Sequence, residues 1–312
     1  MTTPAPAPPA GTLLSKVTTG RITKPHLLII YGPHGVGKST FAADAPAPIF
    51  LGAEDGANNL NVSRLPQTKS LDVVMRGLSE LLHEAHPFKT LVGDSLDWME
   101  GLVYEAVCVD KKVKSIEDIP YGKGYAYALE KWREMMQALT RLREEKGMNI
   151  ILIAHAKIKK FEDPSTPAGY ERYQLKLQTG AATDASALWR EYVDTVLFAN
   201  YVTITSDADK KRGFGDGTRM IYTQRRPGFD AKNRLGLPFE LPLSWQDFEE
   251  AAAKGEPNSA GALLEQIEGL KAQIKQKDLL PKIETAIKAA TGNVTQLAQI
   301  KNRLEALLGA QG

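Results

Sequence analysis

A phosphate-binding loop is the clearest chemical feature of the sequence. The stretch GPHGVGKST matches the pattern G-x-x-x-x-G-K-[ST], with an apolar run before it and a helix-like stretch after it. The glycines permit a turn whose backbone N–H groups converge on an anion, and the following helix N-terminus adds partial positive charge. The pattern predicts a nucleoside triphosphate site formed by Gly32, Pro33, His34, Gly35, Val36, Gly37, Lys38, Ser39 and Thr40.

Several side chains have distinct predicted roles toward ATP and Mg²⁺. Lys38 should reach the β- and γ-phosphates, Ser39 should ligate Mg²⁺, and Thr40 is placed for the α-phosphate. The metal also needs a carboxylate at the end of another buried strand. The segment LVGDSLD supplies Asp94 there, so Ser39 and Asp94 are the predicted metal ligands. The alternative is that Asp94 only caps the next helix.

Hydrolysis also needs a group that polarises the attacking water. The segment FLGAEDG places two acids directly after a second apolar strand. We expect Glu54 to be this base, although a one-residue shift would give the role to Asp55, and a plain surface turn would give it to neither. The segment NIILIAHA ends a further strand in His155, where open α/β sheets bind ligands. His155 is predicted to report the γ-phosphate; a structural histidine is the alternative.

Short apolar strands and amphipathic helices alternate around these residues. Ser70 is predicted to cap a helix with an apolar stripe, and a longer helix is expected over 124–146. The alternation predicts an α/β fold, a RecA-like P-loop core with a mostly parallel sheet covered on both faces. The strand candidates are 26–31, 48–52, 89–93, 149–154, 193–199 and 219–224.

Composition divides the chain into four predicted parts. Residues 1–20 begin with a run of Pro, Ala and Thr that cannot bury a core, so we expect a disordered tail. The ATPase core is expected over 21–248, and a Gly/Pro-containing linker over 249–262. Apolar stripes at helical spacing then predict about three helices in 263–312.

Composition also bounds the function classes. Hydrophobic content of 43% and a formal net charge of +2 are ordinary for a globular protein, so any nucleic-acid contact must come from local patches. The apolar runs are far shorter than the roughly 20 residues of a membrane helix, and the first residues lack a signal-peptide pattern. Cys108 is the only cysteine, which rules out an intrachain disulfide. We expect a cytoplasmic protein with no membrane partner.

The pieces GPHGVGKST, FLGAEDG, LVGDSLD and LIAHAKIKK together resemble the RecA-like core. They look most similar to the phage-encoded proteins related to Sak-type single-strand annealing ATPases. The resemblance covers roughly residues 20–245 and includes YVDTVLFANY and RRPGFDAKNRLGLP.

This resemblance implies roles for particular residues. In RecA a Glu after the second core strand activates water, which carries over to Glu54. The fourth-strand residue that couples nucleotide to DNA is a Gln in RecA, whereas this chain has His155. The segment KNRLG is similar to a RadA-type motif, and in related hexameric helicases such a Lys and Arg reach the neighbouring subunit's γ-phosphate. Lys232 and Arg234 are therefore implied to act in trans; an exposed basic turn is the alternative.

RecA-like proteins line their DNA path with loops after the metal-binding acid and after the fourth strand. The corresponding segments here are KKVKSIEDIPYGKGYAY and AKIKKFEDPSTPAGYERYQLKLQTG, and both are expected to be irregular. They interleave basic with aromatic residues, which suits single strands because cations neutralise phosphates and rings stack on bases. The candidate DNA contacts are Lys111, Lys112, Lys114, Lys123, Lys157, Lys159, Lys160, Phe161, Arg172 and Tyr173.

These features predict an ATP- and Mg²⁺-dependent ATPase that assembles on single-stranded DNA as a filament or ring and promotes strand annealing in phage recombination. A single-strand-binding protein is a further candidate partner. One alternative is a ring-forming motor or helicase-type ATPase, and another is a binding module in which ATP acts as a switch without hydrolysis. A small-molecule P-loop kinase is disfavoured because no acceptor-site or lid segment is visible.

Overall fold

The computed structural model describes most of the chain: residues 17, 22–52, 59–162, 169–202, 204–205, 213–214, 217–254, 260–271, 274, 279–290 and 294–309. Two predictions fall outside these residues. The candidate water-activating acids Glu54 and Asp55 lie in one of the gaps, and nearly all of the Pro/Ala-rich tail precedes the described part.

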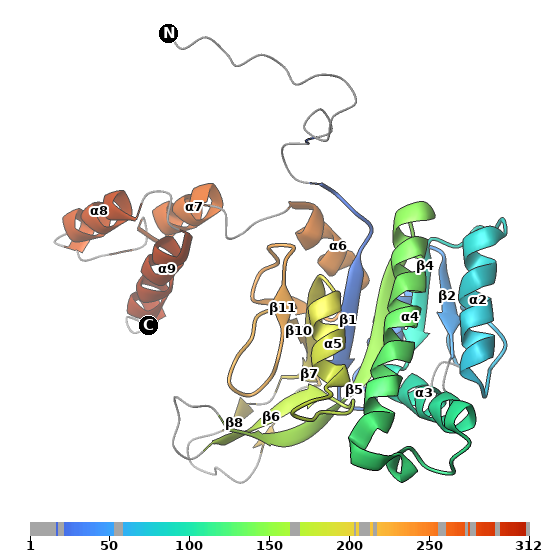
Figure 1. The fold of residues 1–312 in the computed structure, drawn as a ribbon. Coiled ribbons are helices and arrows are strands. Elements are labelled where there is room, and N and C mark those ends of the chain that lie inside the picture. The colour runs from blue at the N-terminus through green and yellow to red at the C-terminus, as the bar shows by residue number, and fades with distance from the viewer. Residues whose placement is uncertain are drawn as a thin grey trace.

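Five parallel strands form the centre of the molecule (Figure 1), in the spatial order β7-β1-β5-β4-β2. The mostly parallel sheet expected from the sequence is therefore confirmed. Strand β5 lies between β1 and β4, so the strand that carries His155 separates the P-loop strand from the strand that ends in Asp94. The bounds are β1 Leu27–Gly32, β2 Pro48–Leu51, β4 Thr90–Asp94, β5 Asn149–Phe161 and β7 Thr195–Tyr201.

Shorter strands complete the two edges of this sheet. β3 (Ser63–Arg64) pairs parallel with β2 at one edge. At the other edge β10 (Arg219–Tyr222) pairs antiparallel with β7, and β12 (Glu240–Pro242) pairs antiparallel with β10. β11 (Lys232–Asn233) also pairs with β7, near the start of that strand. A separate ribbon joins β8 (Ile204–Thr205) to β9 (Gly213–Phe214).

The alternation of buried side chains along β1 explains the two layers of helices. Leu27, Ile29 and Tyr31 belong to one apolar cluster, and Leu28 and Ile30 belong to another, because successive side chains of a strand point to opposite faces. The first cluster packs against α2 Leu71–His83, α3 Leu96–Lys111, α4 Lys123–Glu145 and α5 Ala185–Tyr192. The second packs against α1 Lys38–Ala43 and α6 Trp245–Lys254. The predicted cap of α2 is present, since Ser70 accepts from Val73 N at 3.3 Å.

The boundary predicted before the C-terminal helices is wrong by several residues. The linker was expected from 249, but α6 continues to Lys254 because Phe248 and Ala252 are buried against the sheet. Beyond it, α7 (Ala260–Lys271), α8 (Leu280–Ala289) and α9 (Val294–Gly309) form their own apolar cluster around Ile267 and Leu297 (orange and red in Figure 1). Most residues of the apolar stripes belong to this cluster, whereas Leu307 at the end of the last stripe is 41% exposed.

Both segments expected to be irregular loops contain regular structure. The first forms the end of α3, two short 3-10 turns (Ile116–Asp118 and Pro120–Gly122) and the start of α4. In the second, β5 continues to Phe161 and pairs antiparallel with β6 (Tyr170–Leu175). The reason is visible in the register: Ala156 to Phe161 find backbone partners on β6 from Leu175 back to Tyr170. We call β5 from Lys157 onward together with β6 the basic hairpin.

Candidate active site

The registers of three parallel strands bring the predicted site residues together. Gly32 at the end of β1 is level with His155 on β5, and Asp94 at the end of β4 is level with Ile153, two residues earlier on β5. The P-loop, the candidate metal ligand and the candidate γ-phosphate reporter therefore share the carboxyl end of the sheet. This is the edge at which open parallel sheets bind ligands.

The glycines of the P-loop are required by its backbone. Gly37, the N-cap of α1, has a φ of 108°, in the region that residues with a Cβ rarely adopt. Gly32 has a different reason: a Cβ there would lie 2.1 Å from the carbonyl oxygen of Ala199 on β7. These glycines therefore allow a tight loop before a helix N-terminus, the kind of loop whose backbone N–H groups can bind an anion.

Lys38 and Ser39 both have hydrogen-bond partners at the carboxyl end of the sheet. Lys38 is 5% exposed, and its Nζ donates to the carbonyls of Gly32 at 3.1 Å and Pro33 at 2.8 Å, so the ammonium lies along the loop. Ser39 Oγ donates to Asp94 Oδ2 at 2.8 Å. A hydroxyl and a carboxylate side by side are hard oxygen ligands of the kind Mg²⁺ prefers, so these residues fit the ion. The N-cap of α3 is Ser95, which shows that Asp94 does not serve as that cap.

His155 is held by a carboxylate that the sequence analysis did not select. Asp97, in the first turn of α3, accepts from His155 Nδ1 at 2.9 Å through Oδ2, and from the His155 backbone N–H at 3.1 Å through Oδ1. The ring of His34, from the P-loop, stacks on the ring of His155 with centroids 3.8 Å apart. Burial alone would raise the pKa of Asp97, but the hydrogen bonds from His155 outweigh it and lower the pKa to about 2.

This depressed pKa gives a pH-dependent contribution to stability. The contribution is present above the ordinary carboxyl pKa of 3.8 and is lost as pH falls toward about 2. Its size is about 2 kcal/mol, of which about half should be lost at pH 3. We expect the difference in urea unfolding free energy between wild type and Asp97→Asn to shrink by about 1 kcal/mol from pH 7 to pH 3. A difference independent of pH would contradict the ionised pairing.

A cavity of about 270 Å³ lies between these groups. Its walls come from the P-loop, the start of α1, Leu60, Asp94, Ile153 and His155. Two side chains from β7 and β10 also touch the loop: Tyr201 Oη donates to Gly35 O at 3.0 Å, and Arg219 Nη1 donates to Val36 O at 3.5 Å. Nothing near Tyr201 or Arg219 in the sequence marks them. Asp97 had a signal, since it is an acid only three residues after Asp94.

Lys232 and Arg234 lie at the opposite end of the sheet. β11 pairs Lys232 with Val196 and Asn233 with Thr195, at the start of β7. Through β7, Lys232 is level with Ile29 of β1, three residues before Gly32, which is about 10 Å along the strand at roughly 3.3 Å per residue, and β7 lies between β11 and β1. Neither side chain can span that distance to the P-loop of its own chain. A role at a γ-phosphate therefore requires a second copy, and it stays a prediction.

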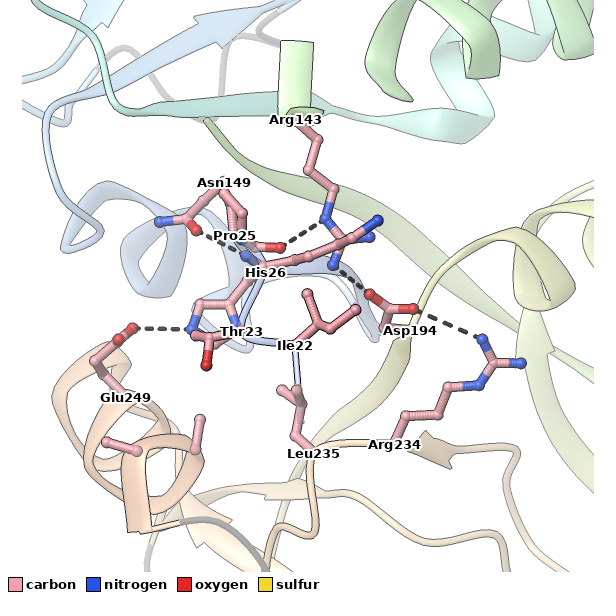
Figure 2. A pocket seen from close by; sticks show the side chains of 13 residues that line it. Ile22, Thr23, Pro25, His26, Arg143, Asn149, Asp194, Arg234, Leu235 and Glu249 are labelled. Atoms are coloured by element: carbon pink, nitrogen blue, oxygen red, sulfur yellow. Dashed lines mark hydrogen bonds and ion pairs between the residues drawn. The ribbon is translucent and has the colours of Figure 1, made fainter. Parts of the chain in front are cut away.

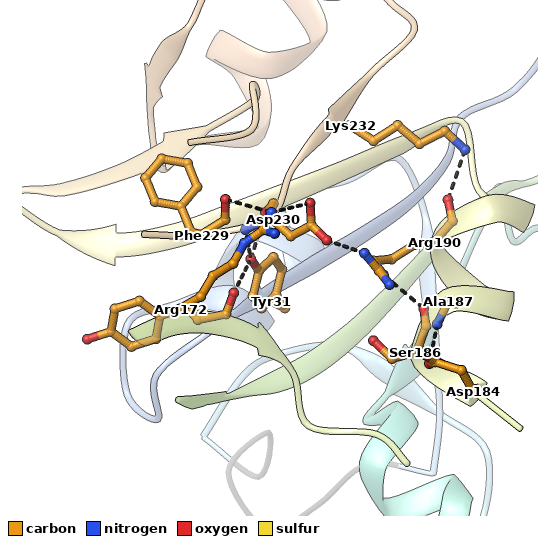
Figure 3. A network of polar contacts seen from close by, with 10 residues as sticks. Tyr31, Arg172, Asp184, Ser186, Ala187, Arg190, Phe229, Asp230 and Lys232 are labelled. Carbon is orange, nitrogen blue, oxygen red and sulfur yellow. Dashed lines mark hydrogen bonds and ion pairs between the residues drawn. The ribbon is translucent and has the colours of Figure 1, made fainter. Parts of the chain in front are cut away.

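The two cations differ in their surroundings. Lys232 Nζ donates to the carbonyls of Arg190, Glu191 and Val193 (Figure 3). It thereby supplies a hydrogen-bond donor to backbone carbonyls at the C-terminal end of α5. The Arg234 side chain is 61% exposed, and its Nη1 is 3.6 Å from Asp194 Oδ1 (Figure 2). Figure 2 shows Arg234 and Arg143 on opposite sides of Asp194, at the edge of a cavity of about 730 Å³. Arg234 is therefore the better placed of the two to meet another molecule.

The candidate DNA contacts separate into exposed and buried groups. Exposed lysines occur in both segments, at Lys111, Lys112, Lys114, Lys123, Lys159 and Lys160. Lys111 Nζ lies 3.8 Å from the centre of the Tyr127 ring, and Lys159 Nζ donates to Thr179 Oγ1 at 2.9 Å. Lys157 is partly buried and donates to Leu177 O, and burial lowers its pKa.

Arg172 is not a surface residue, and the prediction that it contacts DNA is wrong. It is 3% exposed, and its Nη2 pairs with Asp230 at 2.7 Å, while Arg190 pairs with the other oxygen of the same carboxylate (Figure 3). Tyr31 Oη donates to the Asp230 carbonyl at 2.6 Å, and the buried phenol has a raised pKa. The guanidinium is buried because this carboxylate compensates its charge.

The two candidate aromatic contacts also have partners inside the fold. Tyr173 packs on Phe198 with ring centroids 5.1 Å apart, and Arg172 lies over the Phe161 ring at 4.9 Å. Both rings are partly buried, so the exposed lysines are the more accessible part of the predicted DNA surface.

Comparison with known proteins identifies the family. Residues 24–235 match the model of a family described as AAA domain, and no curated protein matches the chain. Among solved structures, the chain is similar to one titled "Crystal structure of the RadB recombinase", at 13% identity, over 65% of this chain and 82% of that chain, with a TM-score of 0.37. Across the described residues no helix is long and apolar enough to cross a membrane. The family match covers more than half of the chain and includes the P-loop, Asp94 and His155, so the protein belongs to the AAA-domain family of P-loop NTPases.

Proposed function

We propose that this protein is a Mg²⁺-dependent ATPase that binds single-stranded DNA and promotes annealing of strands. ATP would bind along the P-loop, with Lys38 at the β- and γ-phosphates and with Ser39 and Asp94 holding Mg²⁺, which supplies charge neutralisation at the phosphates when bound. The geometry of Ser39 and Asp94 supports this assignment. By the motif resemblance, the biological setting we propose is phage recombination.

The observation that carries the DNA-binding proposal is the continuity of β5. This strand passes through the nucleotide site at His155 and becomes the first arm of the basic hairpin two residues later, at Lys157. The second arm returns to the same point, because Lys176 N donates to the His155 carbonyl at 2.8 Å. A displacement of His155 by the γ-phosphate would therefore be transmitted directly to the hairpin, which gives ATP a physical route to DNA affinity.

The surface chemistry of this end of the molecule favours single strands. The basic hairpin and the segment between α3 and α4 lie toward the end of the sheet that carries the P-loop (Figure 1), and both carry exposed lysines. Lys112, Lys114 and Lys123 form no ion pair with the rest of the described chain. Such cations bind phosphates without sequence preference, as expected of a protein that pairs strands of any sequence.

The proposal is tested first on the hairpin. Lys159→Ala combined with Lys160→Ala should weaken single-stranded DNA binding on all sequences and lower the salt slope of log K by about 1.4, at roughly 0.7 per phosphate contact. DNA stimulation of ATP hydrolysis should fall in parallel, while hydrolysis without DNA stays unchanged. Fluorescence anisotropy over a salt series and a coupled ATPase assay measure both.

A matched double variant, Lys89→Ala with Lys146→Ala, removes the same charge from the amino end of β4 and β5 and should leave DNA binding intact. Equal losses in the two double variants would show a general charge effect and contradict a hairpin site. Annealing of complementary oligonucleotides, with no unwinding of forked duplex, separates the proposal from a helicase-type motor.

A further inference from the structure

Asp97 makes contacts that a helix N-terminal acid does not require. Its side chain is 9% exposed, as is that of His155, and both of its oxygens are used on that one residue. One oxygen fixes the backbone of β5 through the His155 N–H, and the other fixes the ring through Nδ1. A carboxylate that only favoured the helix dipole would be exposed and would leave its oxygens to water.

The direction of the ring contact follows from the chemistry of the pair. An ionised carboxylate can only accept hydrogen bonds, so His155 Nδ1 must carry the proton. Nε2 is then the ring nitrogen without a contact to Asp97, on a side chain that lines the nucleotide cavity. Carboxylate–histidine pairs fix tautomer and ring orientation in this way at other sites.

We infer that Asp97 is a positioning residue for ATP hydrolysis, which holds the His155 ring with Nδ1 protonated so that Nε2 is available to the γ-phosphate region. This inference rests on the proposed ATPase function. Asp97 acts through His155 and not on the nucleotide. The ring of His34 stacks on one face of the His155 imidazole and constrains the plane of that ring, while Asp97 constrains its tautomer.

The charged residues around Asp97 and His155 contribute little to the contact between the two. Lys176 Nζ lies 3.8 Å from Asp97 Oδ2, but its side chain is 54% exposed, so this ion pair is weak in water. One helical turn along α3, Glu100 accepts from the backbone N–H of Gln178 at 2.9 Å and anchors the chain just after β6 without touching His155. Glu100 is therefore a matched control: a partly buried carboxylate on the same helix that accepts a backbone hydrogen bond from another segment.

The test is a double-mutant cycle on hydrolysis without DNA. Asp97→Asn should keep the Kd for a fluorescent ATP analogue within about twofold and lower kcat by about 10- to 100-fold, as for other partners that orient a functional histidine. In a His155→Gln background the same substitution should change kcat by less than about twofold, because the residue through which it acts is gone. Glu100→Gln should leave kcat without DNA near wild type.

A second measurement tests the tautomer of His155 directly. With ¹⁵N-labelled histidine, His155, assigned from the spectrum of His155→Gln, should show a protonated Nδ1 in the wild type and lose that signature in Asp97→Asn. The inference is overturned if Asp97→Asn lowers kcat equally in both backgrounds, if Glu100→Gln matches it, or if Nδ1 is unprotonated in the wild type. A wild type without ATPase activity would refute the proposed function instead, and the nitrogen spectra would still decide the tautomer.

Discussion

Lys38→Ala is expected to lower ATP hydrolysis on the order of 10²- to 10³-fold, the cost of removing one preorganised group from a charged transition state. The ammonium lies along the P-loop backbone, 2.8 Å from Pro33 O. Among the described residues that line the cavity there is no second lysine to replace it. A coupled assay at saturating Mg²⁺ and ATP measures the loss.

An exposed lysine away from the site provides the control for this variant. Lys89→Ala, at the amino end of β4, should retain wild-type hydrolysis and the same melting temperature as Lys38→Ala. If Lys38→Ala hydrolyses ATP at the wild-type rate, the P-loop is not the catalytic site of the protein. Loss of DNA binding in Lys38→Ala only when ATP is present would further connect the nucleotide site to the basic hairpin.

Arg234→Ala is expected to lower hydrolysis at least about 10³-fold while ATP binding stays nearly intact, as for an arginine supplied from a neighbouring subunit. The reason is geometric: Arg234 lies at the amino end of the sheet and its side chain is 61% exposed, so it is accessible to another molecule. Its own nucleotide site, at the other end of β1, keeps every P-loop contact. Equilibrium binding of an ATP analogue and the ATPase rate measure the two effects separately.

Complementation gives the sharper form of this experiment. A mixture of Lys38→Ala and Arg234→Ala chains should recover activity, because an intact P-loop on one chain meets an intact Arg234 on its neighbour. Arg141→Ala, an exposed arginine paired with Glu145 on α4, is the matched control and should behave as wild type. No recovery in the mixture, or loss of ATP binding in Arg234→Ala, would contradict action in trans.

Local sequence patterns were sufficient for the features that depend on local geometry. The P-loop is one continuous turn whose glycines and lysine lie close together in the chain. Its sequence pattern therefore predicted the strand–loop–helix conformation and included Ser39 and Thr40. Short continuous apolar runs predicted the central strands, and apolar residues at helical spacing predicted the helices, because a strand covered on both faces is apolar throughout whereas a helix buries one stripe. Asp94 was found for the same reason, at the end of an apolar run.

Contacts between distant segments required the tertiary structure. The sequence does not show that Asp97 meets His155, 58 residues away, because that contact depends on the strand order that places β5 beside β4. Arg172 appeared to be a surface cation because its partner Asp230, also 58 residues away, reaches it only through the packing of β6 against the loop before β11.

Lys232 shows the same limit for a motif residue. The motif KNRLG predicted a functional cation at Lys232. The antiparallel pairing of β11 with β7, which the sequence does not show, places its ammonium against backbone carbonyls at the C-terminal end of α5. The sequence by itself determined which residues have phosphate, metal and basic chemistry, since residue type and short-range spacing encode those properties. The tertiary structure decided which charges are compensated and which remain exposed, because burial and long-range pairing depend on segments that are far apart in the chain.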